Sequence, residues 1–388
     1  MKNSSVYSRD VIIVMAASFF FMFSTMFVTP LMNGYARNLG ASATFAGIIV
    51  GIMSIAAMFL RPVAGNLTDR YSKFSLSLIG GILILIGVVG YVVTPNSEWL
   101  LLFRLVNGTG YVLDTVCMTT WLAYLVPREH VGEAMGFYGL MNALAMAIGP
   151  AISINIYRQV GFRHAMLLSA LSALMMVIMI QFVQRKGRPN ISRRSKMHFK
   201  IIQRDALPVA ILITLFALPY FATQADIVTY VTQRRLDVAV GAYFLIYAVI
   251  LLGLRIILKN LFDTVSFGWW LMISTLATAF YLMMLAIMKS NWQMALAAAG
   301  MAVGYGIIYS VLQSTALLLA PLNEQGLASS TFYLGMDIAM SLGPILGGII
   351  DTIFPIRWYY PVMFVLVPLI LIVYAIYHRP LNHAIRNH

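Results

Sequence analysis

Asp114, Asp226 and Asp337 lie inside long apolar segments of this 388-residue chain, and Arg104 shares a segment with Asp114. A carboxyl group in hydrocarbon loses the hydration of its charged form, so it can bind and release a proton when water reaches it. Asp114 follows Arg104 by ten residues, about 15 Å along a helix and roughly 80° around it, so direct pairing is not expected. We predict proton coupling by Asp114, Asp337, Asp226 and Arg104.

Other kinds of active chemistry lack their residues in this sequence. The six histidines fall in loops, tails or at the edge of an apolar segment, which does not favour a histidine relay or a transmembrane metal site. The sequence has no Gly-rich Lys-Ser/Thr string for ATP, no Gly-x-Ser-x-Gly element and only one cysteine, Cys117. We therefore expect no enzyme activity, no metal, no disulfide and no cofactor, with the proton as the coupling ion.

The segments that carry these residues are long enough to cross a membrane. The chain is 61% hydrophobic and only 10% charged, which excludes a soluble globular protein. A crossing helix needs about 20 apolar residues, and the solid apolar runs do not alternate as the strands of a β-barrel do. We predict an all-α membrane protein with 12 transmembrane helices, at 11–32, 43–63, 74–94, 98–126, 132–156, 163–183, 206–231, 238–259, 265–288, 292–320, 326–351 and 357–377.

The chain repeats itself with an offset of 194 residues. The matching pairs are Arg61 and Arg255, Asp69 and Asp263, Gly110-Tyr111 and Gly304-Tyr305, Pro127 and Pro321, Gly132 and Gly326, and Gly149-Pro150 and Gly343-Pro344. We predict two six-helix bundles, 1–183 and 207–388, related by pseudo-twofold symmetry and joined by a basic cytoplasmic linker at 184–206. Two such bundles can open alternately to either side of a membrane.

The basic residues predict the orientation of the chain. Eight of the 26 Lys and Arg lie within 184–206, and the net charge is +13. Another eight lie in the termini and the other even-numbered loops, against seven in the odd-numbered loops and three within spans. We therefore predict a multi-pass protein of the cell membrane with both termini in the cytoplasm. We interpret the basic linker as a contact to anionic membrane lipid. Nucleic acid is not expected as a partner, and the protein is expected to be a monomer.

The stretch Gly65-Asn66-Leu67-Thr68-Asp69-Arg70-Tyr71-Ser72-Lys73 resembles the signature of the major facilitator superfamily, with Ser72 in place of a usual glycine. We interpret it as a cytoplasmic loop after the second span. Its carboxylate and bases can pair with helix ends or charges of the other bundle and so stabilise one access state. The copy around Asp263 lacks the Gly and the following Arg. The resemblance implies conformational gating by Gly65, Asp69 and Arg70.

Two further stretches are similar to elements of the same family. Arg104-x-x-Asn107-Gly108-x-Gly110 matches an Arg-x-x-Gln-Gly-x-Gly element, with Asn107 in place of Gln. The spacing Gly136-x8-Ala145-x3-Gly149-Pro150 resembles the antiporter signature, in which small residues and a proline produce a close, bent helix pair. The resemblance implies gating by Gly149 and Pro150 and favours the branch of 12-span drug:proton antiporters.

This family fold also suggests where a substrate binds. The residues on spans that usually face the cavity are polar or aromatic: Asn33, Tyr35, Tyr111, Asn142, Tyr220, Gln224, Tyr305, Tyr309, Gln313 and Tyr333. Such a lining suits a small amphipathic, often cationic, compound such as a drug or a metabolite. We predict a secondary active transporter that exports it in exchange for protons. An importer or facilitator, and a non-transporting membrane receptor or lipid-handling protein, are the alternatives.

Overall fold

The computed structural model describes residues 8–188, 199–258 and 261–386. Within these ranges every regular element is a helix, so the prediction of an all-α fold is confirmed. Long apolar segments form helices because a helix satisfies all of its backbone hydrogen bonds internally.

In the described ranges, eleven helical stretches are long and apolar enough to cross a membrane. One of them, Arg128–Gln181, contains α6 (Val131–Gln181), which breaks at Gly161 with φ 78° and ψ 170°. Only glycine adopts such a backbone conformation readily. The predicted spans 132–156 and 163–183 lie on the two sides of this break, so each of the twelve predicted spans overlaps one of the eleven stretches.

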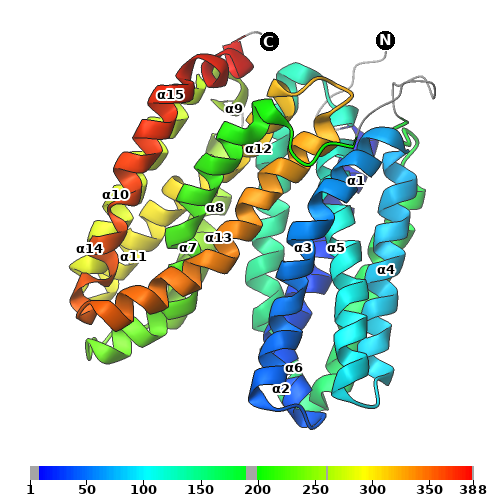
Figure 1. The fold of residues 1–388 in the computed structure, drawn as a ribbon, viewed down its shortest axis with the longest axis horizontal. Helices are drawn as coiled ribbons and strands as arrows, with labels where there is room; N and C mark the ends of the chain where they lie inside the picture. The colour runs from blue at the N-terminus through cyan, green and yellow to red at the C-terminus, as the bar shows by residue number, and fades with distance from the viewer. Residues whose placement is uncertain (1–7, 189–198, 259–260, 387–388) are drawn as a thin grey trace. The chain divides into compact units, whose positions relative to one another are not determined.

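Unit 1 comprises Met1–Pro127, Met141–Gln203 and Pro321–Thr331. Its helices are α1 (Arg9–Val28), α2 (Met32–Asn38), α3 (Ala43–Arg70), α4 (Lys73–Val93) and α5 (Ser97–Leu125), together with most of α6 and the first turns of α13 (Gln325–Ile353). α4 and α5 lie side by side (Figure 1). A Cβ at Gly110 of α5 would lie 2.5 Å from the carbonyl oxygen of Gly80, so the two helices touch through their backbones.

Unit 2 comprises Arg128–Leu140, Arg204–Ala320 and Phe332–His388. Its elements include the first turns of α6, most of α13, and α7 (Leu207–Gln233), α8 (Tyr243–Ile257), α9 (Leu261–Thr264), α10 (Phe267–Ala286), α11 (Asn291–Met301), η5 (Ala302–Ile307), α12 (Ile308–Leu319), α14 (Tyr359–Met363) and α15 (Leu366–Arg386). α11, η5 and α12 form one continuous span, and η5 is π-helical.

The predicted bundle limits, 1–183 and 207–388, stay a prediction. Residues 189–198 of the predicted basic linker at 184–206 lie outside the described residues.

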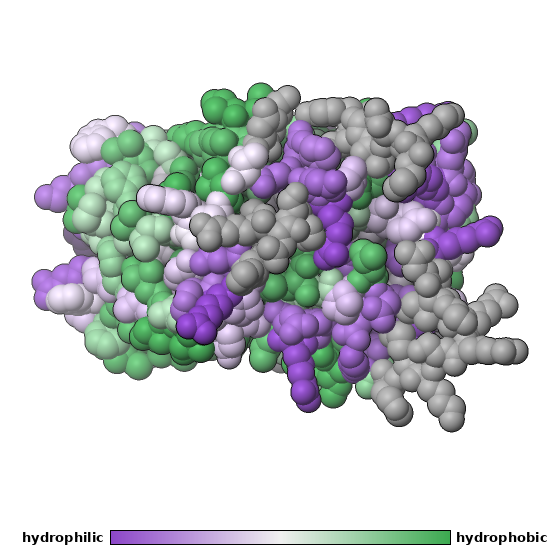
Figure 2. Space-filling model, turned by 90° about the horizontal axis from the view of Figure 1, so that it is seen from above, coloured by the Kyte–Doolittle hydropathy of each residue, from purple (hydrophilic) through white to green (hydrophobic). Residues whose placement is uncertain are grey.

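The outward face of α4 is apolar. Ile82, Ile86, Val89 and Val93 are all exposed, and their spacing of three to four residues places them on one side of the helix. Hydrophilic side chains gather instead on the end of the molecule seen from above in Figure 2. An apolar flank with a polar end is the distribution that a lipid bilayer requires.

The predicted loop at 65–73 is wrong. α3 continues to Arg70, so Gly65, Asp69 and Arg70 lie in its last two turns, and α4 begins at Lys73. The predicted span ended at residue 63 because polar residues follow it. Polar side chains leave the bilayer there without breaking the helix, since no glycine pair or proline interrupts residues 66–70.

Candidate functional site

Four tyrosines meet in the interior of unit 2, and we call them the tyrosine cluster: Tyr220 of α7, Tyr247 of α8, Tyr305 of η5 and Tyr309 of α12. The rings of Tyr220 and Tyr305 stack with their centroids 4.1 Å apart. Tyr247 lies 5.9 Å from Tyr220, and Tyr309 lies 6.2 Å from Tyr305. The cluster presents flat aromatic faces together with phenol hydroxyl groups, which suits a partly apolar ligand.

The π-helical stretch Ala302–Ile307 positions Tyr305 within this cluster. A π-helical turn contains an extra residue and so rotates the side chains that follow it, and such turns are frequent at functional sites. Gly304 packs on Thr278, and Gly306 packs on Leu251. The small residues on either side of Tyr305 therefore allow neighbouring helices to approach the irregular turn.

The tyrosine cluster extends toward α13. Tyr309 contacts Phe332 edge to face at 5.4 Å, and Phe332 contacts Tyr333 at 5.3 Å. Gln313 donates a hydrogen bond from Nε2 to Tyr333 Oη at 2.9 Å. The structure thus brings together Tyr220, Tyr305, Tyr309, Gln313 and Tyr333, all of which the sequence nominated for substrate binding.

Arg255 lies beside the tyrosine cluster and was missed as a site residue in the sequence. It is 2% exposed, its Nη2 donates to the carbonyl oxygen of Gly306, and its Cζ lies 5.1 Å from the centroid of the Phe262 ring. Its Nε and Nη1 have no hydrogen-bond partner among the described residues. The signal that could have indicated this role is an arginine inside an apolar segment.

The predicted coupling residues of unit 1 are deeply buried. Asp114 is 0% exposed, and neither of its carboxyl oxygens has a hydrogen-bond partner in the part of the chain that is described. It faces α4, where a Cβ at Gly80 would lie 2.7 Å from Asp114 Oδ1. Arg104 is also buried, and Tyr91 lies close enough to interact with it. Among the described residues Arg104 and Asp114 form no ion pair.

The other two predicted coupling residues have different surroundings in unit 2. Asp226 is half-buried and accepts a hydrogen bond from Tyr359 Oη at 2.6 Å. Asp337 on α13 is buried. Their role in coupling stays a prediction.

The remaining substrate-binding candidates do not form one group. Tyr35 is buried and donates to the carbonyl oxygen of Tyr91 at 2.7 Å. Asn142 is buried, and both polar atoms of its amide lack a partner among the residues described. Tyr111 lies near Arg61 in unit 1, whereas Asn33 and Gln224 are exposed.

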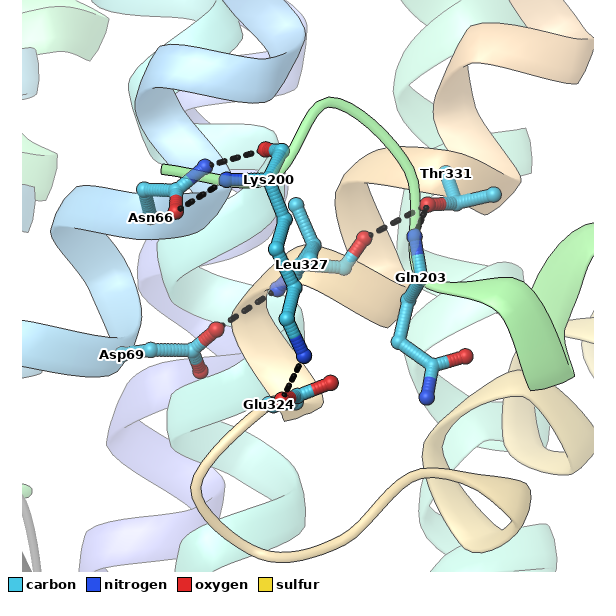
Figure 3. A network of polar contacts seen from close by, with 7 residues as sticks. All are labelled: Asn66, Asp69, Lys200, Gln203, Glu324, Leu327 and Thr331. Atoms are coloured by element: carbon cyan, nitrogen blue, oxygen red, sulfur yellow. Dashed lines mark hydrogen bonds and ion pairs between the residues drawn. The ribbon is translucent and has the colours of Figure 1, made fainter. Parts of the chain in front are cut away.

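Asp69 caps the start of α13 within unit 1 (Figure 3). Its carboxylate accepts the backbone N–H groups of Gly326 at 2.7 Å and of Leu327 at 2.9 Å. A carboxylate stabilises the first turn of a helix, where N–H groups are unpaired and the dipole is positive. The family signature therefore contacts a helix end, and its residues lie on a helix and not in a loop. The gating role of Gly65, Asp69 and Arg70 stays a prediction.

Basic residues that precede α7 join the same network. The side-chain amide of Asn66 donates a hydrogen bond to the carbonyl oxygen of Lys200 and accepts one from its backbone N–H (Figure 3). The Lys200 ammonium forms an ion pair with Glu324. Gln203 N donates to Thr331 Oγ1 at 3.0 Å. The end of the predicted linker is thus fastened to α3 and to the beginning of α13, all within unit 1.

Asp263 makes the equivalent contact within unit 2. Its two oxygens accept the N–H of Glu133 at 3.2 Å, in the first turn of α6. Burial raises the pKa of Asp263 to about 6, and the N–H groups of Glu133 and Gly132 partly oppose this rise. The pairs Asp69–Gly326 and Asp263–Gly132 are related by the 194-residue offset, so the repeat read in the sequence also repeats a contact.

A pocket of about 360 Å³ opens beside Asp263 in unit 2. His130, Glu133 and Asp263 offer possible metal-ligand atoms within 4.8 Å of one another there. The carboxylate of Asp263 is already bonded to the amide of Glu133, so a metal would compete with the helix end for it.

Gly149 and Pro150 lie within α6 in unit 1. A Cβ at Gly149 would lie 3.1 Å from the backbone nitrogen of Phe27, so α6 and α1 approach closely there. The close packing expected from the antiporter-like spacing is present, and the gating role stays a prediction.

A sequence model of the Major Facilitator Superfamily matches residues 14–287 and 260–387. The chain belongs to this superfamily. Its solved neighbours include the human organic anion transporter MFSD10, with a TM-score of 0.76 and 13% identity over 94% of this chain and 98% of that one. A double-Trp mutant of XylE has a TM-score of 0.74 and 14% identity over 95% of each chain. These likenesses confirm the fold.

Relatives of this superfamily member include transporters of several kinds. It is 27% identical over 217 residues to the multi-drug resistance efflux pump PmrA of Streptococcus pneumoniae, which is 54% of this chain and 51% of the pump. The alignment therefore spans about half of the pump. The chain is also 22% identical to the uncharacterized MFS-type transporter YhhS of Escherichia coli, over 82% of this chain and 80% of that protein.

Membership confirms part of the predicted function. The chain belongs to a superfamily of membrane transporters of small molecules, whose members are generally not enzymes. Proton coupling, the direction of transport, the cell membrane as location, the orientation of the termini and the monomeric state remain predictions.

Proposed function

We propose that this superfamily member exports a small amphipathic organic compound, a drug or a metabolite, in exchange for protons by alternating access. The observation that carries the proposal is the carboxyl group of Asp114. It is fully buried and without a hydrogen-bond partner among the described residues.

Ionising Asp114 in this environment would bury a charge without compensation, at a cost of several kcal/mol. Gain or loss of its proton therefore requires water or a new partner, which only a different arrangement of the surrounding helices supplies. Protonation of such a carboxyl group depends on the conformation of the helices around it. Coupling of transport to a proton gradient requires this dependence.

The tyrosine cluster supports the amphipathic character of the substrate. The stacked rings of Tyr220 and Tyr305 bind flat apolar surface, while the Gln313–Tyr333 pair offers hydrogen bonds nearby. The efflux pump among the relatives favours export over import.

Purified protein in lipid vesicles, with an imposed pH gradient, tests the proposal. We would follow fluorescent amphipathic dyes of cationic, neutral and anionic type in wild type, Asp114→Asn and the control Asp237→Asn, which changes an exposed carboxylate. We expect wild type and Asp237→Asn to move at least one dye against its gradient only when the pH gradient is present. Asp114→Asn should lose this dependence on the pH gradient.

Two results would contradict the proposal. The first is an absence of gradient-driven flux for every dye in wild type. The second is an Asp114→Asn variant that responds to the pH gradient as wild type does. If a dye instead moved in the same direction as the protons, toward the alkaline side, the direction of transport would be opposite to the one proposed. The protein would then be an importer.

A further inference from the structure

The guanidinium of Arg255 is buried but uses only part of its hydrogen-bonding capacity. Of the five N–H bonds of an arginine, one lies on Nε and two lie on Nη1. These two nitrogens have no partner within the described residues, while Nη2 donates to Gly306. No ion pair with Arg255 is found in the same residues. A buried cation whose N–H groups lack partners destabilises the folded protein unless an anion binds to it.

The repeat provides an internal comparison for Arg255. Arg61 occupies the equivalent position of the first half, and its Nη1 donates to Thr115 Oγ1. The residue equivalent to Thr115 is Tyr309, and no hydrogen bond from Arg255 to Tyr309 is found among the described residues. The second half has thus kept the arginine without this partner, which is the arrangement expected of a group that receives a ligand.

Two glycines of α6 allow this helix to pack closely against the guanidinium. A Cβ at Gly136 would lie 3.5 Å from Arg255 Nη1, and a Cβ at Gly139 would lie 3.2 Å from Arg255 Nη2. The Cβ at Gly139 would also collide with Ser310 Oγ, a fully buried hydroxyl that has no partner in the described part of the chain. The Ser310 hydroxyl and two guanidinium nitrogens of Arg255 therefore lie near the same glycine-lined face of α6, and none of the three has a hydrogen-bond partner among the described residues.

The tyrosine cluster adjoins these donors. Tyr247 and Tyr309 lie close enough to Arg255 to interact with its charge, and Tyr309 continues to Tyr305 and Tyr220 through ring contacts. A guanidinium binds a carboxylate strongly, and stacked phenol rings bind a flat apolar body. Both are needed to recognise an aromatic carboxylate.

We propose that the transported compound is an organic anion whose carboxylate binds Arg255 while its apolar ring lies on the tyrosine cluster. This inference rests on the proposed transport of a small amphipathic compound and names its charge. It departs from the often cationic compound that the sequence predicts from its aromatic lining and its carboxylates within spans. The guanidinium of Arg255, which is buried beside the tyrosine cluster and has N–H groups without partners among the described residues, is a cation.

Binding of three probes that share one ring system tests the charge directly: 2-naphthoate, 2-naphthamide and 2-naphthylmethylammonium. Each would be titrated into purified protein in detergent, with the shift in apparent Tm and the Kd as readouts. For wild type we expect naphthoate to bind at least about tenfold more tightly than naphthamide, because the amide lacks the negative charge and the second acceptor oxygen that a carboxylate offers to a guanidinium. The ammonium probe should bind most weakly.

Three variants separate recognition from folding. Arg255→Gln should lose the preference for naphthoate, Arg255→Lys should keep part of it, and the control Arg357→Gln, which changes an exposed arginine of unit 2, should keep all of it. Without ligand, Arg255→Gln should be as stable as wild type or more stable, since it removes an uncompensated buried charge. A lower Tm of the free Arg255→Gln variant would point to a structural role and contradict the proposal.

Wild-type protein that binds the three probes equally, that prefers the ammonium, or that binds none of them would overturn the anion site. These outcomes leave the proposed proton-coupled export standing, because that proposal is judged by pH-driven dye flux and by Asp114→Asn. Conversely, wild-type protein could show no pH-driven dye flux and still prefer naphthoate. This result would overturn the proposed proton-coupled export and leave the anion site at Arg255 standing.

Discussion

Gly65 should not tolerate even a methyl group, although it lies in an ordinary helix. A Cβ at this position would lie 2.8 Å from Ser330 Cβ, 3.0 Å from Leu327 Cα and 3.1 Å from the carbonyl oxygen of Gly326. Two of these three atoms belong to the backbone of the segment that begins α13, which cannot move aside as a flexible side chain could. The Gly65→Ala variant must therefore push α3 and this segment apart within unit 1.

α3 supplies its own control for this variant. Gly51 lies on the same helix, and nothing would lie within 4 Å of a Cβ there. Both substitutions gain the same helix propensity, about 1 kcal/mol, so this gain cancels between them. The remaining difference is the cost of overpacking at Gly65, about 1–3 kcal/mol. At about 2–4 °C per kcal/mol for chains of 150–250 residues, Gly65→Ala should melt roughly 2–12 °C below Gly51→Ala.

Thermal unfolding of the two variants in one detergent measures this difference, and vesicle flux measures its consequence. We expect Gly65→Ala to lose transport as well, since Asp69 can no longer hold the N–H groups of Gly326 and Leu327 at 2.7 and 2.9 Å. Equal melting temperatures and equal flux for the two variants would refute the close contact and the gating role drawn from it.

The structure makes two further predictions about single residues. Burial raises the pKa of Asp263 to about 6 from the ordinary 3.8, so the folded protein binds this proton more tightly than the unfolded chain does. Wild type should then gain stability relative to Asp263→Asn as the pH falls from about 6 to about 4, by at most about 3 kcal/mol, and a Tm difference that stays constant over this range would contradict it. Cys117, the only cysteine, is fully buried and bonded to Thr68 Oγ1 at 3.0 Å. A maleimide should leave it unmodified in the folded protein and label it completely in sodium dodecyl sulfate, whereas rapid labelling of the folded protein would show that α5 is not packed as described.

Much of the fold was predictable because membrane helices depend on local composition. The apolar runs predict the number of spans, and the break at Gly161 lies between two predicted spans that α6 joins, so it does not change that number. The end of α3 was misplaced because the sequence signal reports where the bilayer ends, and a helix continues past that point when its next residues favour it.

The sequence was enough to predict an all-α membrane protein with an internal repeat, because hydrocarbon imposes the same requirement on every segment independently of the others. Which polar groups meet depends on the tertiary structure. The π-helical turn at Tyr305, the open nitrogens of Arg255 and the position of Asp114 against Gly80 depend on how helices distant in sequence are rotated against one another. That rotation is set by the packing of many side chains at once, and no single segment encodes it.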